Sequence, residues 1–274
     1  MPTSEFYLLT AISNLHAGSG EGDFSIVDKQ VQRDSITALP VIHASGIKGA
    51  LREAAELPAR NPAAATIETV FGSEPGDGKS LQGLYQFHDA KLLCLPVRSS
   101  HHLYYRATCP HIVQELANSA AVLGKAFAAG LSATLAALAT LQPQRGAPLY
   151  LSAQPAPGLR LEDWTAQHQS PPAGFDAAAA KAVFGERLAL LHDDDFKELS
   201  QALPVIARNY LENGISQNLW YEEVVPRESR FFFPVIRPDG DQLLDQILTQ
   251  LNHRLQVGAN ATVGYGLCQI QAIA

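Results

Sequence analysis

Residues 39–57 impose the strictest requirement on the fold, because an extended apolar run leads directly into an amphipathic helix. The run LPVI (residues 39–42) predicts an extended segment. The residues after it predict a helix that begins at Ser45 and ends near Leu57. Ile47 and Leu51 stand at i and i+4, so they share one helix face that can enter a core. The segment therefore predicts a strand-to-helix unit with one buried helix face.

The start of this helix has the composition of an anion-binding site. A serine at the N-cap accepts a hydrogen bond from an otherwise unpaired backbone N–H, so Ser45 is the predicted cap. The remaining free N–H groups, that of Gly46 included, and the positive end of the helix dipole attract negative charge. Lys48 and Arg52 lie one turn apart on one face, where an anion lying across both would remove their repulsion. The alternative is a surface helix with two solvated cations.

The charge balance limits the kind of surface that this chain presents. Of its 274 residues, 46% are hydrophobic and 17% are charged, which is typical of a globular chain with a substantial core. The formal net charge is −7, which argues against a protein that coats nucleic acid with its whole surface. Any nucleic-acid site must therefore be a local basic groove.

Cysteine usage and hydropathy predict a soluble, cytoplasmic protein. Cys94, Cys109 and Cys268 lie far apart and form no C-x-x-C pair, which indicates reduced, buried thiols and no thiolate-rich zinc site. The N-terminus has no basic region followed by a long apolar core, so no signal peptide is expected. The run 120–141 is long enough to span a bilayer, but Lys125, glycines and hydroxyl residues interrupt it, and we interpret it as a packed helix.

The expected elements follow one another in the order of an α+β fold. Glu5–Ser13 is apolar on both faces and predicts a central strand, which a long Gly-rich connection follows. We predict one domain over residues 1–274, with a ferredoxin-like or RRM-like core in which helices pack on one face of an antiparallel sheet. The proline-rich residues 142–176 predict an inserted arm outside this core. Other expected strands lie at 83–95, 102–108, 188–191, 219–225, 229–236 and 267–273. Other expected helices lie at 66–71, 176–183 and 241–251, and a long helix and its neighbour occupy 111–141.

Several sequence blocks, taken together and in order, resemble one protein family. From Leu15 to Leu267 the chain carries LHAGSGEG, VDKQVQRD, LPVIHASGIKGALRE, LPVRS, YYRATCP, LALLHDDDF, LWYEEVVP and GANATVGYGL. These blocks resemble the RAMP superfamily of CRISPR-associated RNA-binding proteins, and most of all the repeated backbone subunit of the type III-B (Cmr) effector complex. Residues 142–176 fall outside the match, and the resemblance implies a thumb-like arm there.

The resemblance implies an RRM-like core that binds CRISPR guide RNA and acts in antiviral defence. It implies that copies stack head to tail into a filament with other subunits of the Cmr complex, and that complementary target RNA is cut at regular intervals. It implies no membrane partner. A non-catalytic RNA-binding scaffold of the same superfamily and the type III-A counterpart are the alternatives, of which LWYEEVVP and the TCP segment favour type III-B.

The resemblance also places Asp28 at the position of the family's catalytic aspartate. RNA supplies its own nucleophile, the 2′-OH beside the scissile phosphate, so cleavage needs little more than one well-placed carboxylate. Asp28 would hold a divalent metal, Mg²⁺ or Mn²⁺, or take the proton of the 2′-OH. On composition alone, an aspartate in a loop is more often a turn-forming residue.

Three further residues are catalytic candidates. His16 can move protons near neutral pH, and its alternative role is to cap the end of the first strand. Tyr221 and Glu222 lie beside Glu223 in the LWYEEVVP block. Because adjacent strand residues point to opposite faces, at most one of the two glutamates faces RNA, and a structural ion pair is the alternative.

The expected RNA contacts combine basic residues with glycine-containing segments. The cations are Arg33, Lys48, Arg52 and Arg98. Gly264 and Gly266 allow a backbone to approach closely, while Tyr265 would stack on a base or be buried against the sheet. Ser45 and Gly46 complete the set. The family form there is P-G-S-S-L-K, whereas HASGIK has glycine in place of one hydroxyl residue, which leaves only the backbone N–H of Gly46 for a phosphate.

Overall fold

The computed structural model describes residues 2–20, 27–57, 64–73, 78 and 80–274, so part of the Gly-rich connection, residues 21–26, lies outside the described residues. The strands of its main sheet are β1 (Thr3–Ala11), β2 (Val41–Ile42), β3 (Gln86–Phe87), β4 (Ala90–Arg98), β5 (Tyr104–Thr108), β6 (Leu149–Leu151), β9 (Gln167–Gln169), β10 (Leu188–Leu190), β13 (Arg230–Arg237), β14 (Arg254–Gln256) and β15 (Leu267–Ala272). Their order is β14-β15-β1-β13-β4-β5-β10-β6-β9, with β2 paired to β4 and β3 to β13. Most pairs are antiparallel, whereas β10 runs parallel to β5 and β9 parallel to β6.

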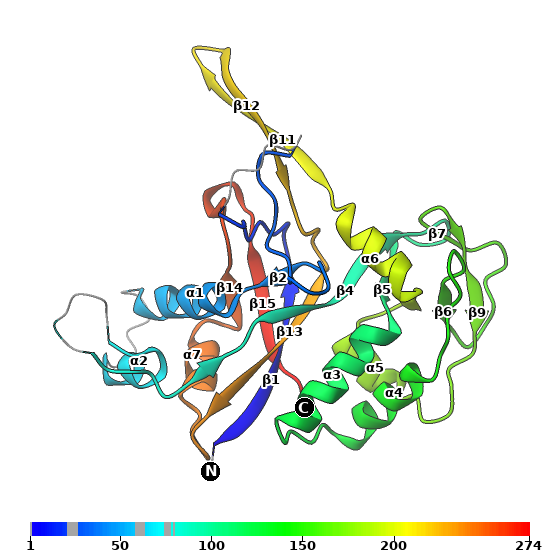
Figure 1. The fold of residues 1–274 in the computed structure, drawn as a ribbon, viewed down its shortest axis with the longest axis horizontal. Coiled ribbons are helices and arrows are strands. Elements are labelled where there is room, and N and C mark those ends of the chain that lie inside the picture. Colours follow the sequence, from blue (N-terminus) through cyan, green and yellow to red (C-terminus); the bar gives the residue numbers. More distant parts are fainter. Residues whose placement is uncertain (1, 21–26, 58–63, 74–77, 79) are drawn as a thin grey trace.

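The helices fall into two groups at the two ends of this sheet. They are α1 (Ala44–Glu56), α2 (Ala64–Phe71), α3 (Pro110–Val122), α4 (Ala129–Ala139), α5 (Ala177–Val183), α6 (Asp193–Gln201) and α7 (Leu243–Gln250), with a short 3-10 helix at Ala261–Val263. In Figure 1, α1, α2 and α7 lie on the side of β14, while α3, α4 and α5 lie on the side of β6 and β9. The predicted α+β class is confirmed, and the sheet is mixed at one end.

The core is centred on β1 and β13, which pair from Thr3 with Arg237 to Thr10 with Arg230. Both strands are apolar on both faces, as expected for the middle of a covered sheet. Phe6 is fully buried, and its ring meets that of Phe127 edge-on with centroids 5.3 Å apart. The FFF run of β13 is buried as well, so burial of aromatic side chains stabilises the centre of the fold.

A two-stranded hairpin, which we call the arm, projects from the body of the molecule (Figure 1). It consists of β11 (Val205–Glu212) and β12 (Ile215–Glu223), which pair with each other in a sheet of their own. Residues 142–176, where we expected the arm, instead form β6, β7 (Arg160–Leu161), β8 (Trp164–Thr165) and β9. Leu159 and Leu161 are fully buried there, because apolar residues between the prolines pack against the sheet.

Two further expectations need correction. Helix α1 begins at Ala44 with His43 as its N-cap, and Ser45 lies inside the first turn. The cap position has no side-chain hydrogen bond; the carboxylate of Asp89 accepts the N–H of Ala44 at 2.7 Å instead. The run 120–141 is not one packed helix, because α3 ends at Val122, α4 begins at Ala129, and the chain turns between them at Gly124 with φ +68°. No helix in the described parts of the chain has the length and hydropathy to cross a bilayer.

Candidate functional site

The chain segment that carries Asp28 lies along the base of the arm. Lys29 and Glu222 form a parallel β-bridge, although they are far apart in sequence. The N–H of Lys29 donates to the carbonyl of Tyr221 at 3.1 Å, and the N–H of Glu223 donates to the carbonyl of Lys29 at 2.9 Å. The segment is therefore held in place by backbone hydrogen bonds to β12, next to the point where the arm meets the body.

Asp28 presents an exposed carboxylate at this position. Its Oδ2 accepts the backbone N–H of Tyr221 at 2.8 Å, while Oδ1 has no hydrogen-bond partner within the described chain. One oxygen thus fixes the orientation of the group and the other faces solvent. Tyr221 contributes its backbone to this arrangement, and its side chain is also exposed.

Glu222 lies behind Asp28 as a buried, ionised carboxylate. It is 1% exposed and accepts from Lys29 Nζ at 3.2 Å, Trp220 Nε1 at 2.9 Å, Arg208 Nε at 3.1 Å and Asn260 Nδ2 at 2.9 Å. Burial raises its pKa, but the hydrogen bonds from Trp220 and Lys29 outweigh burial and lower the pKa to about 2. A carboxylate with four donors has little capacity left for a substrate, so the geometry favours the structural ion pair.

Glu223 forms the second internal ion pair. Its Oε1 lies 2.5 Å from Arg33 Nη2, and its Oε2 accepts the N–H of Val31 at 3.0 Å. Arg33 also donates to the carbonyls of Ala38 and Ser200, each at 3.0 Å. The guanidinium of Arg33 is thereby used within the fold, and we do not carry Arg33 forward as a phosphate contact.

His16 is buried and lies beneath the same strand end. Its Nδ1 is 2.7 Å from the carbonyl oxygen of Glu223, and its own carbonyl accepts the N–H of Ala259 at 2.9 Å. A Cβ added at Gly18 would lie 3.0 Å from Nε2 of His16, and one at Gly258 would lie 2.4 Å from its backbone oxygen. Both glycines therefore let chain segments pack closely on His16, which favours the capping role over proton transfer.

The glycine loop 264–266 contacts the arm through the side chain of Tyr265. The guanidinium of Arg208 stacks over the ring of Tyr265, with Cζ 4.4 Å from the ring centroid. Gly266 has φ +74°, and a Cβ there would lie 2.0 Å from the carbonyl oxygen of Val257. Gly264 has φ +84° with open space around it. Close packing requires glycine at 266, whereas the exposed backbone at 264 is open to a ligand.

Helix α1 carries four of the remaining predicted RNA contacts, and in Figure 1 it lies beside the main sheet, away from the tip of the arm. Asp89 occupies its N-terminal end, bonded to the N–H of Ala44 and 3.5 Å from Nδ1 of His43, so a carboxylate already sits at the expected anion site. Arg52 bonds to Glu56 at 2.7 Å and to the carbonyls of Gly72 and Ser73. These contacts satisfy Arg52 within the fold. Lys48 has no ion-pair partner among the described residues and is half-buried; Ser45 and Gly46 are exposed.

Arg98 lies elsewhere again, at the end of β4. Its side chain is 83% exposed and pairs with Glu162 at 2.6 Å, and this pairing raises the pKa of the guanidinium. The structure thus brings Asp28, Tyr221, Glu222, His16 and the glycine loop together at the base of the arm. It leaves the α1 residues and Arg98 apart from them.

Four residues of this site escaped the sequence analysis. They are Lys29, Arg208, Trp220 and Asn260, all of which surround Glu222. Lys29 is adjacent to Asp28 and Trp220 to Tyr221, so proximity to the predicted residues was an available signal. The strand that carries Arg208 was not predicted at all, since β11 lacks the apolar alternation of a half-buried strand.

The arrangement can orient one carboxylate toward a bound polyanion. A single aspartate oxygen is able to take a proton from a hydroxyl group or to serve as one ligand of a divalent cation whose other ligands are water and phosphate. Among the described residues no group of three or more His, Cys, Asp or Glu side chains could hold a metal by itself. Among the described residues Asp28 could thus supply one ligand of a metal ion, and further ligands would be needed to hold it.

Comparison with known proteins defines the class of protein. The family model of the RAMP superfamily matches residues 8–269, which is nearly the whole chain, and the protein therefore belongs to the RAMP superfamily. Over 286 aligned residues the chain is 27% identical to the CRISPR system Cmr endoribonuclease Cmr4 of Pyrococcus furiosus, with 96% of this chain and 93% of that protein covered.

Solved structures show the same fold. A chain of the type III-B Cmr-beta complex bound to cognate target RNA matches with a TM-score of 0.78 at 20% identity, covering 98% of this chain and 97% of that one. The oligomeric Cmr4 from Pyrococcus furiosus matches with a TM-score of 0.72 at 22% identity, covering 100% and 98%. The expected α+β fold is thus shared with these chains.

Proposed function

We propose that this protein is a backbone subunit of a type III-B CRISPR effector complex, which binds guide RNA and cuts complementary target RNA. The observation that carries this proposal is the exposed Asp28 carboxylate, anchored to the arm by the N–H of Tyr221. The similarity to an endoribonuclease of the Cmr system supports it. The proposed partners are guide RNA, target RNA, further copies of this chain in a filament and the other subunits of the complex.

The proposed reaction is cleavage by the RNA's own hydroxyl group. The 2′ oxygen attacks the adjacent phosphorus in line, the O2′–P bond forms, the P–O5′ bond breaks, and the departing 5′ oxygen takes a proton from water. The products are a 2′,3′-cyclic phosphate and a 5′-hydroxyl end. Oδ1 of Asp28 receives the proton of the 2′-OH, while the hydrogen bond to Oδ2 keeps the carboxylate oriented. In the alternative role, Oδ1 would hold a divalent metal, Mg²⁺ or Mn²⁺, which would neutralise charge on the phosphate.

The exchange Asp28→Asn in the reconstituted complex tests this assignment. We expect the rate of target cleavage to fall at least about 100-fold, because general acid–base groups contribute about 100- to 10,000-fold. The guide RNA content of the complex should remain unchanged. A matched control is Asp239→Asn, which changes another exposed aspartate in the turn before α7 and should leave the rate unchanged. Equal cleavage by wild type and Asp28→Asn would favour a scaffold without catalytic activity.

Removal of divalent metal tests the second part of the proposal. Treatment of the wild-type complex with EDTA should stop cleavage, and addition of Mg²⁺ or Mn²⁺ should restore it. The cleaved ends should be a cyclic phosphate and a 5′-hydroxyl, measured by mass spectrometry of the fragments. Full activity in EDTA would leave Asp28 as a general base only and would contradict the metal requirement.

A further inference from the structure

The residue after Asp28 is a lysine whose ammonium group is half-exposed at the base of the arm. Nζ of Lys29 lies 3.2 Å from Oε1 of Glu222 and 5.2 Å from the centroid of the Trp220 ring. The side chain of Lys29 is 53% exposed, whereas that of Glu222 is 1% exposed. An ammonium group has three N–H donors, of which Glu222 accepts one. The contacts with Glu222 and Trp220 thus hold a cation in place while donors remain for a ligand.

Three consecutive residues of β12 hold the aspartate and the lysine. The backbone N–H of Tyr221 donates to Oδ2 of Asp28 at 2.8 Å. The side chains of the two neighbouring residues, Trp220 and Glu222, contact Lys29. These two side chains lie on the same face of the strand, since alternate residues point the same way. No ion pair joins Asp28 to Lys29 in the described parts of the chain, so a proton acceptor and a cation are both open to a third group.

Arg208 is the second cation on Glu222, and it is covered where Lys29 is not. Its Nε lies 3.1 Å from Oε2 of Glu222, and its side chain is 20% exposed. The ring of Tyr265 packs on the guanidinium, with Cζ 4.4 Å from the ring centroid. One buried carboxylate thus meets two cations, and Lys29 is the one of the two that presents its charge to solvent.

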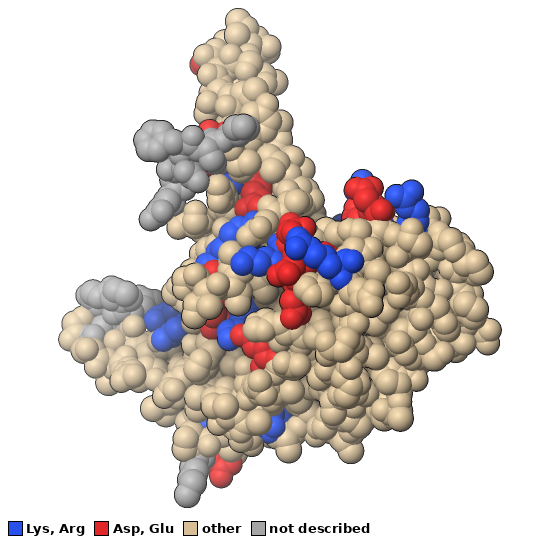
Figure 2. Space-filling model, turned by 45° about the vertical axis from the view of Figure 1, so that its right-hand side comes forward, with Lys and Arg blue, Asp and Glu red and all other residues tan. Residues whose placement is uncertain are grey.

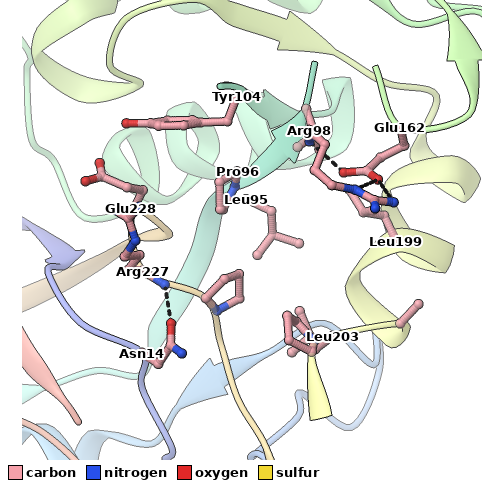
Figure 3. A pocket seen from close by; sticks show the side chains of 14 residues that line it. Asn14, Leu95, Pro96, Arg98, Tyr104, Glu162, Leu199, Leu203, Arg227 and Glu228 are labelled. Atoms are coloured by element: carbon pink, nitrogen blue, oxygen red, sulfur yellow. Dashed lines mark hydrogen bonds and ion pairs between the residues drawn. The ribbon is translucent and has the colours of Figure 1, made fainter. Parts of the chain in front are cut away.

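Charged groups elsewhere near the arm are balanced in sign. On the face seen in Figure 2, acidic and basic side chains lie side by side below the arm, so this face has no extended patch of one sign. A cavity of about 510 Å³ beside the arm has the same balance, since its charged lining residues are two arginines and two glutamates. Figure 3 shows Arg98 and Glu162 joined on its rim. A phosphate at the base of the arm therefore depends on single cations, and Lys29 directly follows Asp28 in the chain.

We propose that Lys29 is a catalytic residue, whose ammonium group donates a hydrogen bond to a non-bridging oxygen of the scissile phosphate. As the 2′ oxygen bonds to phosphorus, negative charge grows on the non-bridging oxygens, and Oδ1 of Asp28 receives the proton of the 2′-OH. Nζ of Lys29 keeps its own protons, so no bond to this group forms or breaks. A cation fixed beside developing negative charge lowers the barrier, because it needs no reorganisation during the reaction. The inference rests on the proposed function and adds a second group to its reaction.

The alternative is that Lys29 serves only to hold Glu222. Trp220, Arg208 and Asn260 also donate to this carboxylate, so three donors remain when Lys29 is removed. An ion pair with a half-exposed lysine adds little to stability, because solvent screens it. Glu222 is therefore held without Lys29, whereas contact with a phosphate explains why the ammonium group is exposed at this position.

The exchange Lys29→Met in the reconstituted complex tests the proposal. Cleavage is measured in a single turnover with saturating target RNA, so that the rate reports the chemical step. We expect the rate to fall about 10- to 100-fold, which is the size of a hydrogen bond to a charged group. Lys29→Arg keeps the charge and should restore most of the rate. Lys181→Met, which removes an exposed lysine of α5 that pairs with Glu186 at 2.7 Å, is the matched control and should leave the rate unchanged. A wild-type rate in Lys29→Met would overturn the proposal.

Target RNA with sulfur in place of one non-bridging oxygen separates the catalytic role from a structural one. Sulfur accepts hydrogen bonds more weakly than oxygen, so the wild-type complex should cleave the two phosphorothioate diastereomers at different rates. We expect Lys29→Met to reduce this difference, because the contact that distinguishes the two oxygens is lost. The same ratio of rates in both proteins would overturn the proposal.

Two controls show which proposal a negative result overturns. Amide exchange at residues 221–223 of the complex should be unchanged by Lys29→Met. Faster exchange there together with slow cleavage would assign Lys29 a structural role and overturn its catalytic one. Asp28→Asn is assayed alongside, and a wild-type rate in that variant would overturn the proposed function. Loss of cleavage in Asp28→Asn with full cleavage in Lys29→Met would overturn the role of Lys29 alone.

Discussion

The carboxylate of Glu222 is buried and ionised, and it accepts hydrogen bonds from four donors. Removing a hydrogen-bonded charge from such a site leaves Lys29 and Arg208 without their partner. The same applies to Glu223 and Arg33. The buried charged side chains nearest to Asp28 thus mainly stabilise the junction between the arm and the body. The carboxylate of Asp28 itself stays exposed and available to RNA.

We expect Glu222→Gln to lower the free energy of unfolding by about 2–3 kcal/mol near neutral pH, because hydrogen bonds to charged groups are worth about 1.5–3 kcal/mol. The pKa of Glu222 is lowered from 4.5 to about 2 in the folded chain. Its stabilisation is therefore fully present above pH 4.5 and is lost as the pH falls toward 2. Urea denaturation of both proteins over this pH range measures the effect, and the difference between them should shrink with acidity.

The control for this change is Glu212→Gln at the tip of the arm, where the carboxylate is exposed. Surface substitutions of this kind change the stability by less than about 0.5 kcal/mol. A pH-independent difference between wild type and Glu222→Gln would contradict the ionised, hydrogen-bonded state described above.

At the scale of elements, the arm is a sheet of two strands, and neither strand pairs with a strand of the main sheet. An isolated two-stranded hairpin is marginal in water. Its upper part exposes apolar side chains, with Tyr210 and Leu211 each 56% exposed and Ile215 65% exposed. Its lower part is bound to the Asp28 segment by backbone hydrogen bonds. The arm is therefore anchored at its base and free at its tip.

Amide hydrogen exchange should reveal this gradient along the arm. In the isolated chain we expect rapid exchange at residues 209–218 and slow exchange at 221–223, because the N–H of Tyr221 donates to Asp28, that of Glu223 donates to Lys29, and Glu222 and Glu223 are buried. Peptides of β1 serve as the slow reference. On assembly with guide RNA and further copies, the tip should become protected. Protection of the tip in the isolated chain equal to that of β1 would contradict a free tip.

At the scale of the whole molecule, one hydrophobic cluster extends from β14 and α7 through the central strands to α4 and α5. All three cysteines lie in this cluster, and Cys94 and Cys268 are fully buried. Burial raises the pKa of both thiols to about 12, and it raises the pKa of Cys109 as well. The prediction of reduced, buried thiols is confirmed, since all three are free and buried.

Thiol reactivity should therefore report on the integrity of the whole core. We expect native protein to resist iodoacetamide at about pH 8, because only the thiolate reacts and these thiols stay protonated and covered. All three should react after unfolding in guanidinium. Mass spectrometry before and after unfolding counts the labelled residues. Fast labelling of Cys94 or Cys268 in the native state would show that the core opens locally.

The sequence alone was enough to predict the fold class and the family, and it made Asp28 a candidate. Strand and helix periodicity is local, so the apolar β1 and the face of α1 with Ile47 and Leu51 could be predicted and are confirmed. The motif blocks and their order identified the family. Each of these signals lies within a few consecutive residues, so it can be recognised in the sequence alone.

Only the tertiary structure decided which charges are free and where the arm lies. Arg33 and Glu223 are 190 residues apart, and Lys29 and Glu222 are 193 residues apart, so no local pattern encodes which cation meets which carboxylate. The arm has weak apolar alternation because a hairpin without a neighbouring layer has no core face to bury. Ser45 likewise does not cap the helix, because the helix begins one residue earlier and Asp89, in the connection between β3 and β4, accepts the N–H of Ala44. Pairing across long sequence separations is a property of packing, and packing exists only in the folded chain.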